Sequence, residues 1–139
     1  MPRFSRISAE RLLTCHPDLI AIFNEVVKHV DISIVCGHRG EKEQNEAFNS
    51  GHSQRRYPNS FHNYIPSVAI DVMLWHQQEP HVRWDDIVGA AWLAGYVQRI
   101  ADELGVGIKF GGNWDGDDEF DDNTFNDYAH YELTSGFSA

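Results

Sequence analysis

The stretch VAIDVML (residues 68–74) is a short apolar run that predicts a β-strand, and one acidic residue, Asp71, interrupts it. Because side chains alternate across a strand, Ala69 and Met73 share the face of Asp71, and both are apolar. A carboxylate in such surroundings is costly to bury unless it is paired or bound to a metal ion. Asp71 is therefore a candidate functional residue, and the alternative is a solvent-facing position on the strand.

The segments on either side of this strand predict helices and further short strands. The expected elements are a helix over 9–15 with Ser8 as its N-cap, a core helix that begins at Pro17, a strand over 32–37, a helix over 41–51, a helix over 84–104, and strands over 107–111 and 129–133. No internal repeat or low-complexity linker separates them. We therefore expect one α+β domain over residues 1–139, with a short antiparallel sheet packed against helices.

The composition is that of a globular protein with an acidic surface. The chain has 139 residues, 42% of them hydrophobic, and a formal net charge of -10. This charge argues against binding to nucleic acid and against electrostatic adhesion to anionic membranes. No stretch approaches the roughly 20 apolar residues of a spanning helix, so we expect no membrane insertion. Two cysteines, Cys15 and Cys36, are too few for a disulfide framework, and we expect both to be reduced thiols. We also expect a monomer.

Two histidines could join Asp71 in a metal site. His62 lies nine residues upstream, at the end of a polar loop, and His130 lies in the predicted strand over 129–133. Two imidazoles and one carboxylate are a suitable ligand set for zinc, and they leave a fourth position open to water. The alternative is ordinary, because a lone histidine is more often a surface residue or a satisfied core residue than a ligand.

Two acids flank His130 in the stretch NDYAHYEL (residues 126–133). Metal-assisted hydrolysis needs a base that takes a proton from water and returns it to the leaving amine. Asp127, three residues before His130, could be that base. Glu132, two residues after His130, would share its strand face and could accept a hydrogen bond from an imidazole N–H.

Five short stretches, taken together and in this order, resemble one enzyme family. They are IVCGHRGEKEQ (34–44), SFH (60–62), VAID (68–71), IKFGGNW (108–114) and NDYAHYEL (126–133). The order is similar to that of the zinc D-alanyl-D-alanine carboxypeptidases, and above all to their phage endolysin branch. Members of that branch are L-alanyl-D-glutamate peptidases, which cut the peptide stems of peptidoglycan.

The resemblance implies a role for each matching residue. It implies zinc ligands at His62, Asp71 and His130, a general base at Asp127, a substrate-holding or polarising guanidinium at Arg39, and substrate-groove positions at Gln44 and Ser60. Independently of the resemblance, Trp114 could line the site, because it stands next to the acidic loop over residues 115–123. Glu132 is expected to support an imidazole ligand rather than to act as a catalyst.

One spacing departs from the family pattern. Eight residues, NYIPSVAI, separate His62 from Asp71, where the family usually has six. Two inserted residues could loop out around Pro66 and leave both ligands in place. His38 is the substitute ligand if they do not.

The acidic stretch over residues 115–123 has two interpretations. Its dense carboxylates could collect a hard cation such as calcium, but they lack the residue order of an EF-hand loop. A solvated loop that borders the substrate groove is the alternative.

The leading hypothesis is a zinc peptidase of peptidoglycan stems, an endolysin that cuts between L-alanine and D-glutamate. Because the N-terminal residues MPRFSRISAE lack the apolar run of a secretory signal, we expect cytoplasmic accumulation and release to the wall through a membrane lesion. The alternatives are a bacterial D,D- or L,D-carboxypeptidase, and a non-catalytic relative that binds peptidoglycan or calcium.

Overall fold

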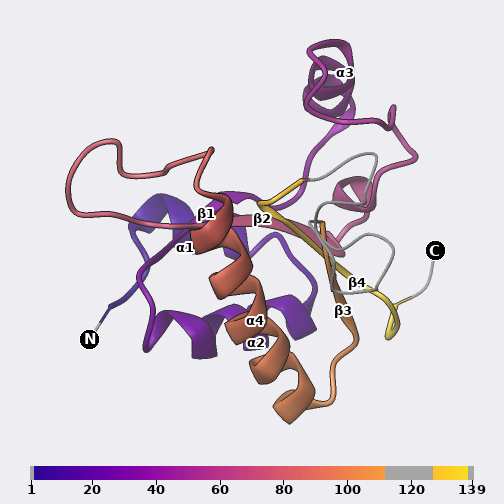
Figure 1. Cartoon of the computed structure of the whole chain (residues 1–139). Helices are drawn as coiled ribbons and strands as arrows, with labels where there is room; N and C mark the ends of the chain where they lie inside the picture. The colour runs from indigo at the N-terminus through magenta and orange to yellow at the C-terminus, as the bar shows by residue number, and fades with distance from the viewer. Residues whose placement is uncertain (1, 112–126, 138–139) are drawn as a thin grey trace.

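The structure, a computed structural model, describes residues 2–111 and 127–137 (Figure 1). Trp114 and the acidic stretch over 115–123 lie outside these residues. The described elements are α1 (Arg6–Leu12), α2 (Pro17–Val27), β1 (Ile32–Cys36), α3 (Glu41–Asn49), the short 3-10 helix η1 (Phe61–Asn63), β2 (Ala69–Leu74), α4 (Ile87–Leu104), β3 (Ile108–Phe110) and β4 (His130–Leu133).

The four strands form one antiparallel sheet in the order β1-β2-β4-β3. Strand β2, which holds residues 69–74 of the VAIDVML stretch, therefore lies between β1 and β4. In the register of β2 and β4, Ile70 stands opposite Tyr131 and Asp71 stands opposite His130. The arrangement confirms the prediction of an α+β fold with a short antiparallel sheet against helices.

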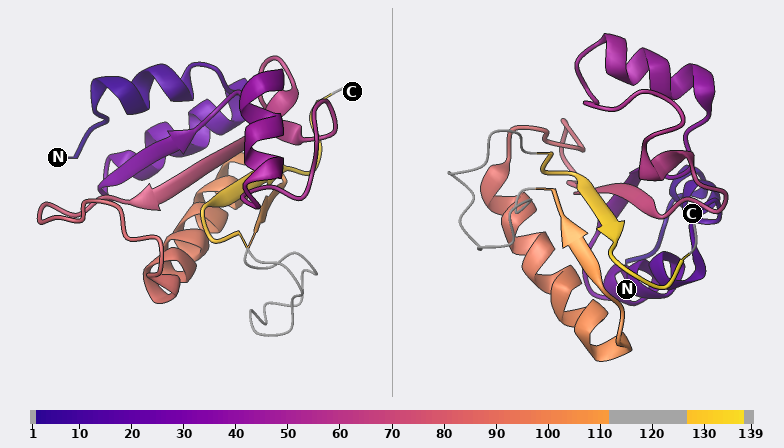
Figure 2. Two further views of the ribbon diagram at one scale, coloured as in Figure 1. Left: turned by 90° about the horizontal axis from the view of Figure 1, so that it is seen from above. Right: turned by 90° about the vertical axis from the view of Figure 1, so that its right-hand side faces the viewer.

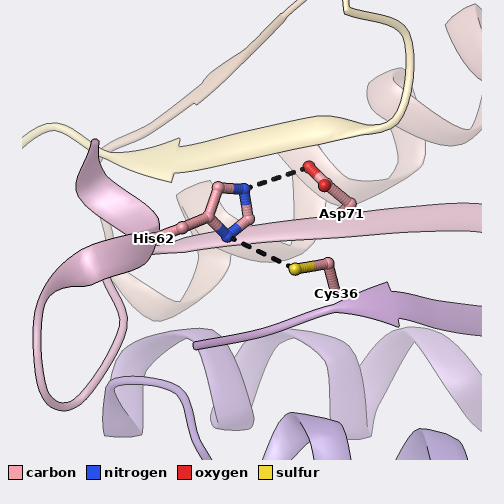
Figure 3. Close-up of side chains that lie close together, drawn as sticks. All are labelled: Cys36, His62 and Asp71. Carbon is pink, nitrogen blue, oxygen red and sulfur yellow. Dashed lines mark hydrogen bonds and ion pairs between the residues drawn. The ribbon is translucent and has the colours of Figure 1, made fainter. Parts of the chain in front are cut away.

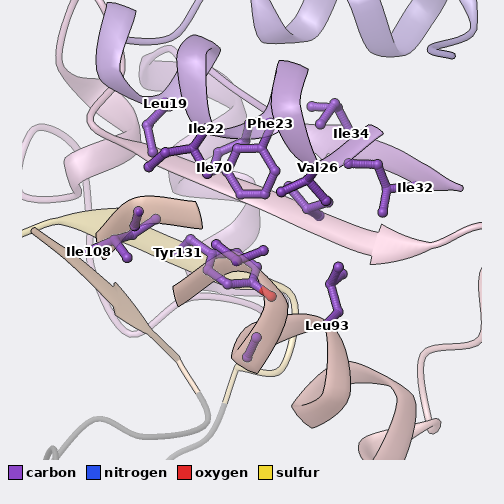
Figure 4. Close-up of a cluster of buried hydrophobic side chains, with 14 of the residues drawn as sticks. Leu19, Ile22, Phe23, Val26, Ile32, Ile34, Ile70, Leu93, Ile108 and Tyr131 are labelled. Carbon is purple, nitrogen blue, oxygen red and sulfur yellow. The ribbon is translucent and has the colours of Figure 1, made fainter. Parts of the chain in front are cut away.

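The core lies between the sheet and the helices α2 and α4 (Figure 4). The face of α2 that carries Leu19, Ile22, Phe23 and Val26 is fully buried, which fits its apolar repeat at helical spacing. Tyr131 of β4 points into the same cluster and meets the ring of Phe23 edge-on, with ring centroids 5.6 Å apart. Burial of the sheet face that carries Ile70 and Tyr131 fixes the register of the strands, because a shift by one residue would turn the apolar side chains of that face outward.

Two helix starts differ from the prediction. The N-cap of α1 is Ser5, whose Oγ accepts from the backbone N–H of Ser8. Ser8 itself is buried inside the helix, where its Oγ accepts from the N–H of Ile34 and ties α1 to β1. Helix α4 begins at Ile87 rather than at residue 84. Asp86 is its N-cap, because Oδ1 of Asp86 accepts from the backbone N–H of Gly89.

Helix α3 stands apart from the helices that cover the core (Figures 1 and 2). It follows β1 directly, and the segment after it leads to η1 and then into β2. The connection from β1 to its neighbour β2 therefore includes both α3 and η1. Among the described helices, none has the length and apolar character that crossing a membrane requires.

Candidate metal centre

Three adjacent strands place polar side chains on the sheet face opposite the core. Asp71 pairs with His130 on β4 and with Cys36 on β1, where the register shifts by one residue. Since Ile70 and Tyr131 point into the core, their strand neighbours Asp71 and His130 point to the other face. The apolar pattern that buries one face of the sheet thus brings the carboxylate and the imidazole together on the other.

His62 reaches the same place from the 3-10 turn η1. Ser60 caps this turn, because its Oγ accepts from the backbone N–H of His62. The Nδ1–H of His62 donates to the carbonyl oxygen of Gly37 at 2.8 Å. In the neutral ring this hydrogen bond places the proton on Nδ1 and turns the lone pair of Nε2 toward Oδ1 of Asp71, 3.3 Å away (Figure 3).

His130 is oriented in the same way by a different acceptor. Its Nε2–H donates to Oε1 of Glu132 at 2.8 Å. Its Nδ1 lies 3.2 Å from Oδ1 of Asp71 and 3.3 Å from Nε2 of His62. A carboxylate or carbonyl that accepts from the outer nitrogen of a histidine is the usual support of a metal ligand.

The three inward-facing atoms form a triangle whose size suits zinc. Its sides, between His62 Nε2, Asp71 Oδ1 and His130 Nδ1, are 3.2 to 3.3 Å. Ligand atoms about 2.0–2.1 Å from zinc at tetrahedral angles lie about 3.3–3.4 Å from one another. The donor set and its spacing therefore fit zinc with three protein ligands and an open fourth position.

Asp127 stands at the edge of this triangle. Ligating atoms of Asp71, Asp127 and His130 all lie within 4.8 Å of one another. The Oδ1 atom of Asp127 accepts from the N–H of Ala129, which holds the carboxylate in place just before β4. Burial, and then the negative charge of Asp71, raise the pKa of Asp127 above its ordinary value. A carboxylate with a raised pKa beside a metal site is suited to proton transfer.

Two glycines allow these close approaches. A Cβ atom on Gly37 would overlap Oγ1 of Thr14, so a larger residue could not present its carbonyl to His62 in the same way. A Cβ atom on Gly111 would overlap the carbonyl oxygen of Asp127. Each glycine thus lets the backbone that carries or orients a site residue come close to a neighbouring segment.

The ionisable groups of the triangle are strongly coupled. Burial alone would lower the pKa of His62, but the carboxylate of Asp71 raises it to about 10. Burial is likewise outweighed at His130, whose pKa is raised by hydrogen bonds to Asp71 and Glu132. In turn the two imidazoles hold the pKa of Asp71 well below its usual range, although burial opposes them. The site is thus built to hold positive charge against the carboxylate.

Cys36 is a further polar neighbour, on the outer side of His62. Its Sγ lies 4.0 Å from Nδ1 of His62, and Cys36, His62 and Asp71 form a second group whose ligating atoms lie within 4.8 Å of one another (Figure 3). Burial would raise the pKa of the thiol, but the hydrogen bond to His62 lowers it below its ordinary value. Both cysteines are free, as predicted.

Arg39 lies beside the candidate ligands. Its Nη2 is 3.4 Å from Oδ2 of Asp71, the carboxylate oxygen that does not face the imidazoles. Its Nη1 donates to Oε1 of Gln44 at 3.0 Å. Gln44 is fully buried and Ser60 nearly so. The predicted substrate contacts of Gln44 and Ser60 stay predictions, and in the structure both side chains make hydrogen bonds within the protein.

The insertion between His62 and Asp71 does not separate them. Ile65, in the stretch NYIPSVAI between the two residues, is 86% exposed, whereas Ser67 and Val68 on its C-terminal side are buried. The additional chain length is therefore accommodated at the surface. His38 belongs to neither potential metal-binding group among the described residues.

Sequence reasoning missed several contacts of the centre. It did not single out the carbonyl of Gly37, the thiol beside His62, or the side chain of Asn63, which donates to the carbonyl of Arg39. These contacts join residues about 25 positions apart, and no periodic pattern reports them. The sequence signal nearest to these contacts is the predicted strand over 32–37, which ends in Cys36 and Gly37.

Two imidazoles, a carboxylate and an adjacent acid on a small α+β sheet are groups that could hold a metal ion and assist hydrolysis. Residues 1–134 match the family model of the phage L-alanyl-D-glutamate peptidases. The chain belongs to this family and is a peptidase of peptidoglycan. The crystal structure of the Serratia marcescens L-Ala D-Glu endopeptidase ChiX is similar, with a TM-score of 0.74 and 30% identity over 95% of this chain and 90% of that one. No curated protein sequence matches the chain.

Proposed function

We propose that the protein is a zinc endopeptidase that hydrolyses the bond between L-alanine and D-glutamate in peptidoglycan stems. The observation that carries this proposal is the triangle of His62 Nε2, Asp71 Oδ1 and His130 Nδ1, with sides of 3.2 to 3.3 Å. Zinc held by these three residues would act as a Lewis acid on the scissile carbonyl and would lower the pKa of bound water to about 7. The family and the similarity to an L-Ala D-Glu endopeptidase support the choice of bond.

Asp127 acts as the base in this proposal. Water attacks the carbonyl carbon of L-alanine, and Asp127 accepts the proton that the water loses. When the bond between that carbon and the nitrogen of D-glutamate breaks, the same carboxyl group returns the proton to the departing amine. The raised pKa of Asp127 fits both directions of transfer, because burial and Asp71 bring its proton affinity closer to neutral pH.

Arg39 binds the substrate or its oxyanion. Its guanidinium stands 3.4 Å from Asp71 and its side chain is 14% exposed, so it keeps some access to the surface beside the triangle. A guanidinium can pair with a substrate carboxylate, such as one carried by D-glutamate, or stabilise the charge that develops on the attacked carbonyl oxygen. Gln44, Ser60 and Trp114 remain proposed substrate-groove positions, and Glu132 the support of His130.

Digestion of purified peptidoglycan tests the proposed bond. Mass spectrometry should detect released stems that begin with D-glutamate, and glycan strands that retain L-alanine. Stems shortened by one D-alanine would instead identify a carboxypeptidase. Binding to peptidoglycan without any release would identify a non-catalytic relative. A chelator-treated sample, assayed again after zinc is restored, separates dependence on the metal from the choice of bond.

The remaining proposals concern the state of the protein in the cell. We expect a monomer with no nucleic-acid partner, in keeping with the charge of -10. We also expect accumulation in the cytoplasm before the enzyme reaches the wall. Calcium binding by residues 115–123 stays an untested alternative for that stretch.

A further inference from the structure

Asn63, the residue after His62, links the turn that carries the candidate zinc ligand to the loop that carries Arg39. Its Oδ1 accepts from the N–H of Ser60 at 3.0 Å, which closes the turn η1. Its Nδ2 donates to the carbonyl oxygen of Arg39 at 2.9 Å. In return, the N–H of Arg39 donates to the carbonyl oxygen of His62 at 2.8 Å. Both backbone polar groups of Arg39 are thus bonded to the turn that holds His62.

Gln44 holds the guanidinium group of Arg39. Its buried Oε1 accepts from Nη1 of Arg39 at 3.0 Å and from Nδ2 of Asn63 at 3.3 Å. Its Nε2 donates to the carbonyl oxygen of Arg55 at 2.6 Å and to Oγ of Ser53 at 3.0 Å. Because each end of this amide has its own partners, only one orientation satisfies them all.

Three side chains contact Arg39, one at its backbone and two at its guanidinium. Asn63 bonds its backbone carbonyl, Gln44 bonds Nη1, and Asp71 lies beside Nη2. Asn63 is the member that touches both the backbone of Arg39 and the acceptor of its guanidinium. A change at Asn63 would therefore displace Arg39 relative to His62 without removing either residue.

We propose that Asn63 is a positioning residue, whose side-chain amide sets the guanidinium of Arg39 at its working distance from the metal centre. The inference rests on the proposed role of Arg39 in substrate binding or oxyanion stabilisation. Asn63 does not act on the substrate itself. Its effect on turnover passes through Arg39.

The variant that tests this is Asn63→Asp. The aspartate can still accept from the N–H of Ser60, so the turn η1 keeps its cap. It cannot donate, and a carboxylate oxygen then faces the carbonyl of Arg39 and the Oε1 of Gln44. Because displacement of a catalytic group by about 1 Å can lower a rate by about 10²-fold, we expect kcat/KM to fall by roughly 10 to 100-fold.

The experiment is a double-mutant cycle with Arg39→Ala, assayed on peptidoglycan stems with zinc-loaded protein. We expect Asn63→Asp to lower kcat/KM in the wild-type background and to change it by less than about 2-fold when Arg39 is absent. Zinc content and the melting temperature should stay close to wild type in each variant. Asn45→Asp is the matched control, because the Asn45 side chain accepts from the N–H of Tyr57 and, among the described residues, makes no other side-chain hydrogen bond; it should leave kcat/KM unchanged.

Each other outcome counts against the inference in a different way. An equal loss in both backgrounds would show that Asn63 acts independently of Arg39, and loss of zinc with activity would make its role structural. An unchanged rate in Arg39→Ala would refute the proposed role of Arg39 together with the inference, while zinc-dependent cleavage would still support the rest of the proposed function. If Asn63→Asp fails to fold, Asn63→Ala removes the donor without opposing two acceptors. Failure of both variants to fold would overturn the inference.

Discussion

The Nε2 atom of His62 and the Nδ1 atom of His130 lie 3.3 Å apart and face the same oxygen of Asp71. The outer nitrogen of each ring already donates, to Gly37 in one case and to Glu132 in the other. Two imidazole lone pairs at this distance repel each other unless a cation lies between them. In the metal-free protein, protons on these nitrogens can supply the positive charge. Zinc fits the same position between the rings, so protons and zinc should compete for it.

His62, rather than His38, should be required for zinc. His62→Ala removes one corner of the triangle, and we expect the protein to lose at least 100-fold in zinc affinity, with a parallel loss of activity. His38→Ala should bind zinc as the wild type does. Competition titration with a colorimetric chelator measures both affinities. Zinc loss in His38→Ala but not in His62→Ala would mean that the inserted residues have changed the ligand.

Glu132 should strengthen zinc binding through His130. In Glu132→Gln the amide oxygen can still accept from Nε2–H of His130, but the negative charge that raises the basicity of the ring is gone. We expect zinc affinity to fall about 10 to 100-fold, with kcat of the zinc-saturated enzyme nearly unchanged. Glu103→Gln, at an exposed ion pair with Arg99, is the control for loss of one acidic charge. A large fall in kcat at saturating zinc would instead give Glu132 a direct catalytic role.

Asp127 should be needed for turnover but not for the metal. In Asp127→Asn the amide oxygen can still accept from the N–H of Ala129, so the approach to β4 is preserved. An amide cannot take the proton of the attacking water, and we expect kcat to fall about 10² to 10⁴-fold. Asp102→Asn, an exposed aspartate on α4, serves as the control. Wild-type rates in zinc-loaded Asp127→Asn would transfer the role of base to Glu132.

The extent to which the sequence predicted this centre follows from the kind of signal each residue carries. Asp71 interrupts an apolar strand, so its position in the pattern identified it, and its pairing with two histidines confirms that it is not a solvent-facing residue. The alternation of β4 placed His130 and Glu132 on one face. The N-cap of α1 was misassigned because Ser5 and Ser8 are both acceptable caps, and only the tertiary contact of Ser8 with Ile34 distinguishes them.

The metal-free protein should lose stability as the pH rises, whereas the stabilisation that zinc adds should grow. The pKa of His62 is about 10 in the folded protein, against an ordinary 6.5, because Asp71 outweighs the effect of burial. Protonated His62 therefore stabilises the metal-free fold fully below pH 6.5, and this stabilisation is lost as the pH rises toward 10. In the zinc-loaded protein fewer protons compete as the pH rises, so stabilisation by zinc grows.

Urea unfolding between pH 6.5 and 9.5, with a chelator or with excess zinc, measures both trends. The free energy of unfolding should fall with pH in the chelator and rise, relative to the chelated sample, in zinc. His62→Gln in the chelator is the control, and its pH dependence should be flatter than that of the wild type. A chelated wild-type protein that gains stability over this range would contradict the raised pKa of His62.

Tyr131 should be replaceable by phenylalanine with a gain in stability. Its side chain is 1% exposed, and in the part of the chain that the structure describes its hydroxyl has no hydrogen-bond partner. A buried, unpaired polar group costs about 1–3 kcal/mol, whereas the ring packs edge-on against Phe23 and would do so without the hydroxyl. We expect Tyr131→Phe to raise the free energy of unfolding by about 1 kcal/mol, measured by urea denaturation of zinc-saturated protein. Tyr57→Phe, at a residue that is 40% exposed, should change it by less than about 0.5 kcal/mol. A loss of stability in Tyr131→Phe would show that the hydroxyl is hydrogen-bonded in solution to a polar partner inside the core.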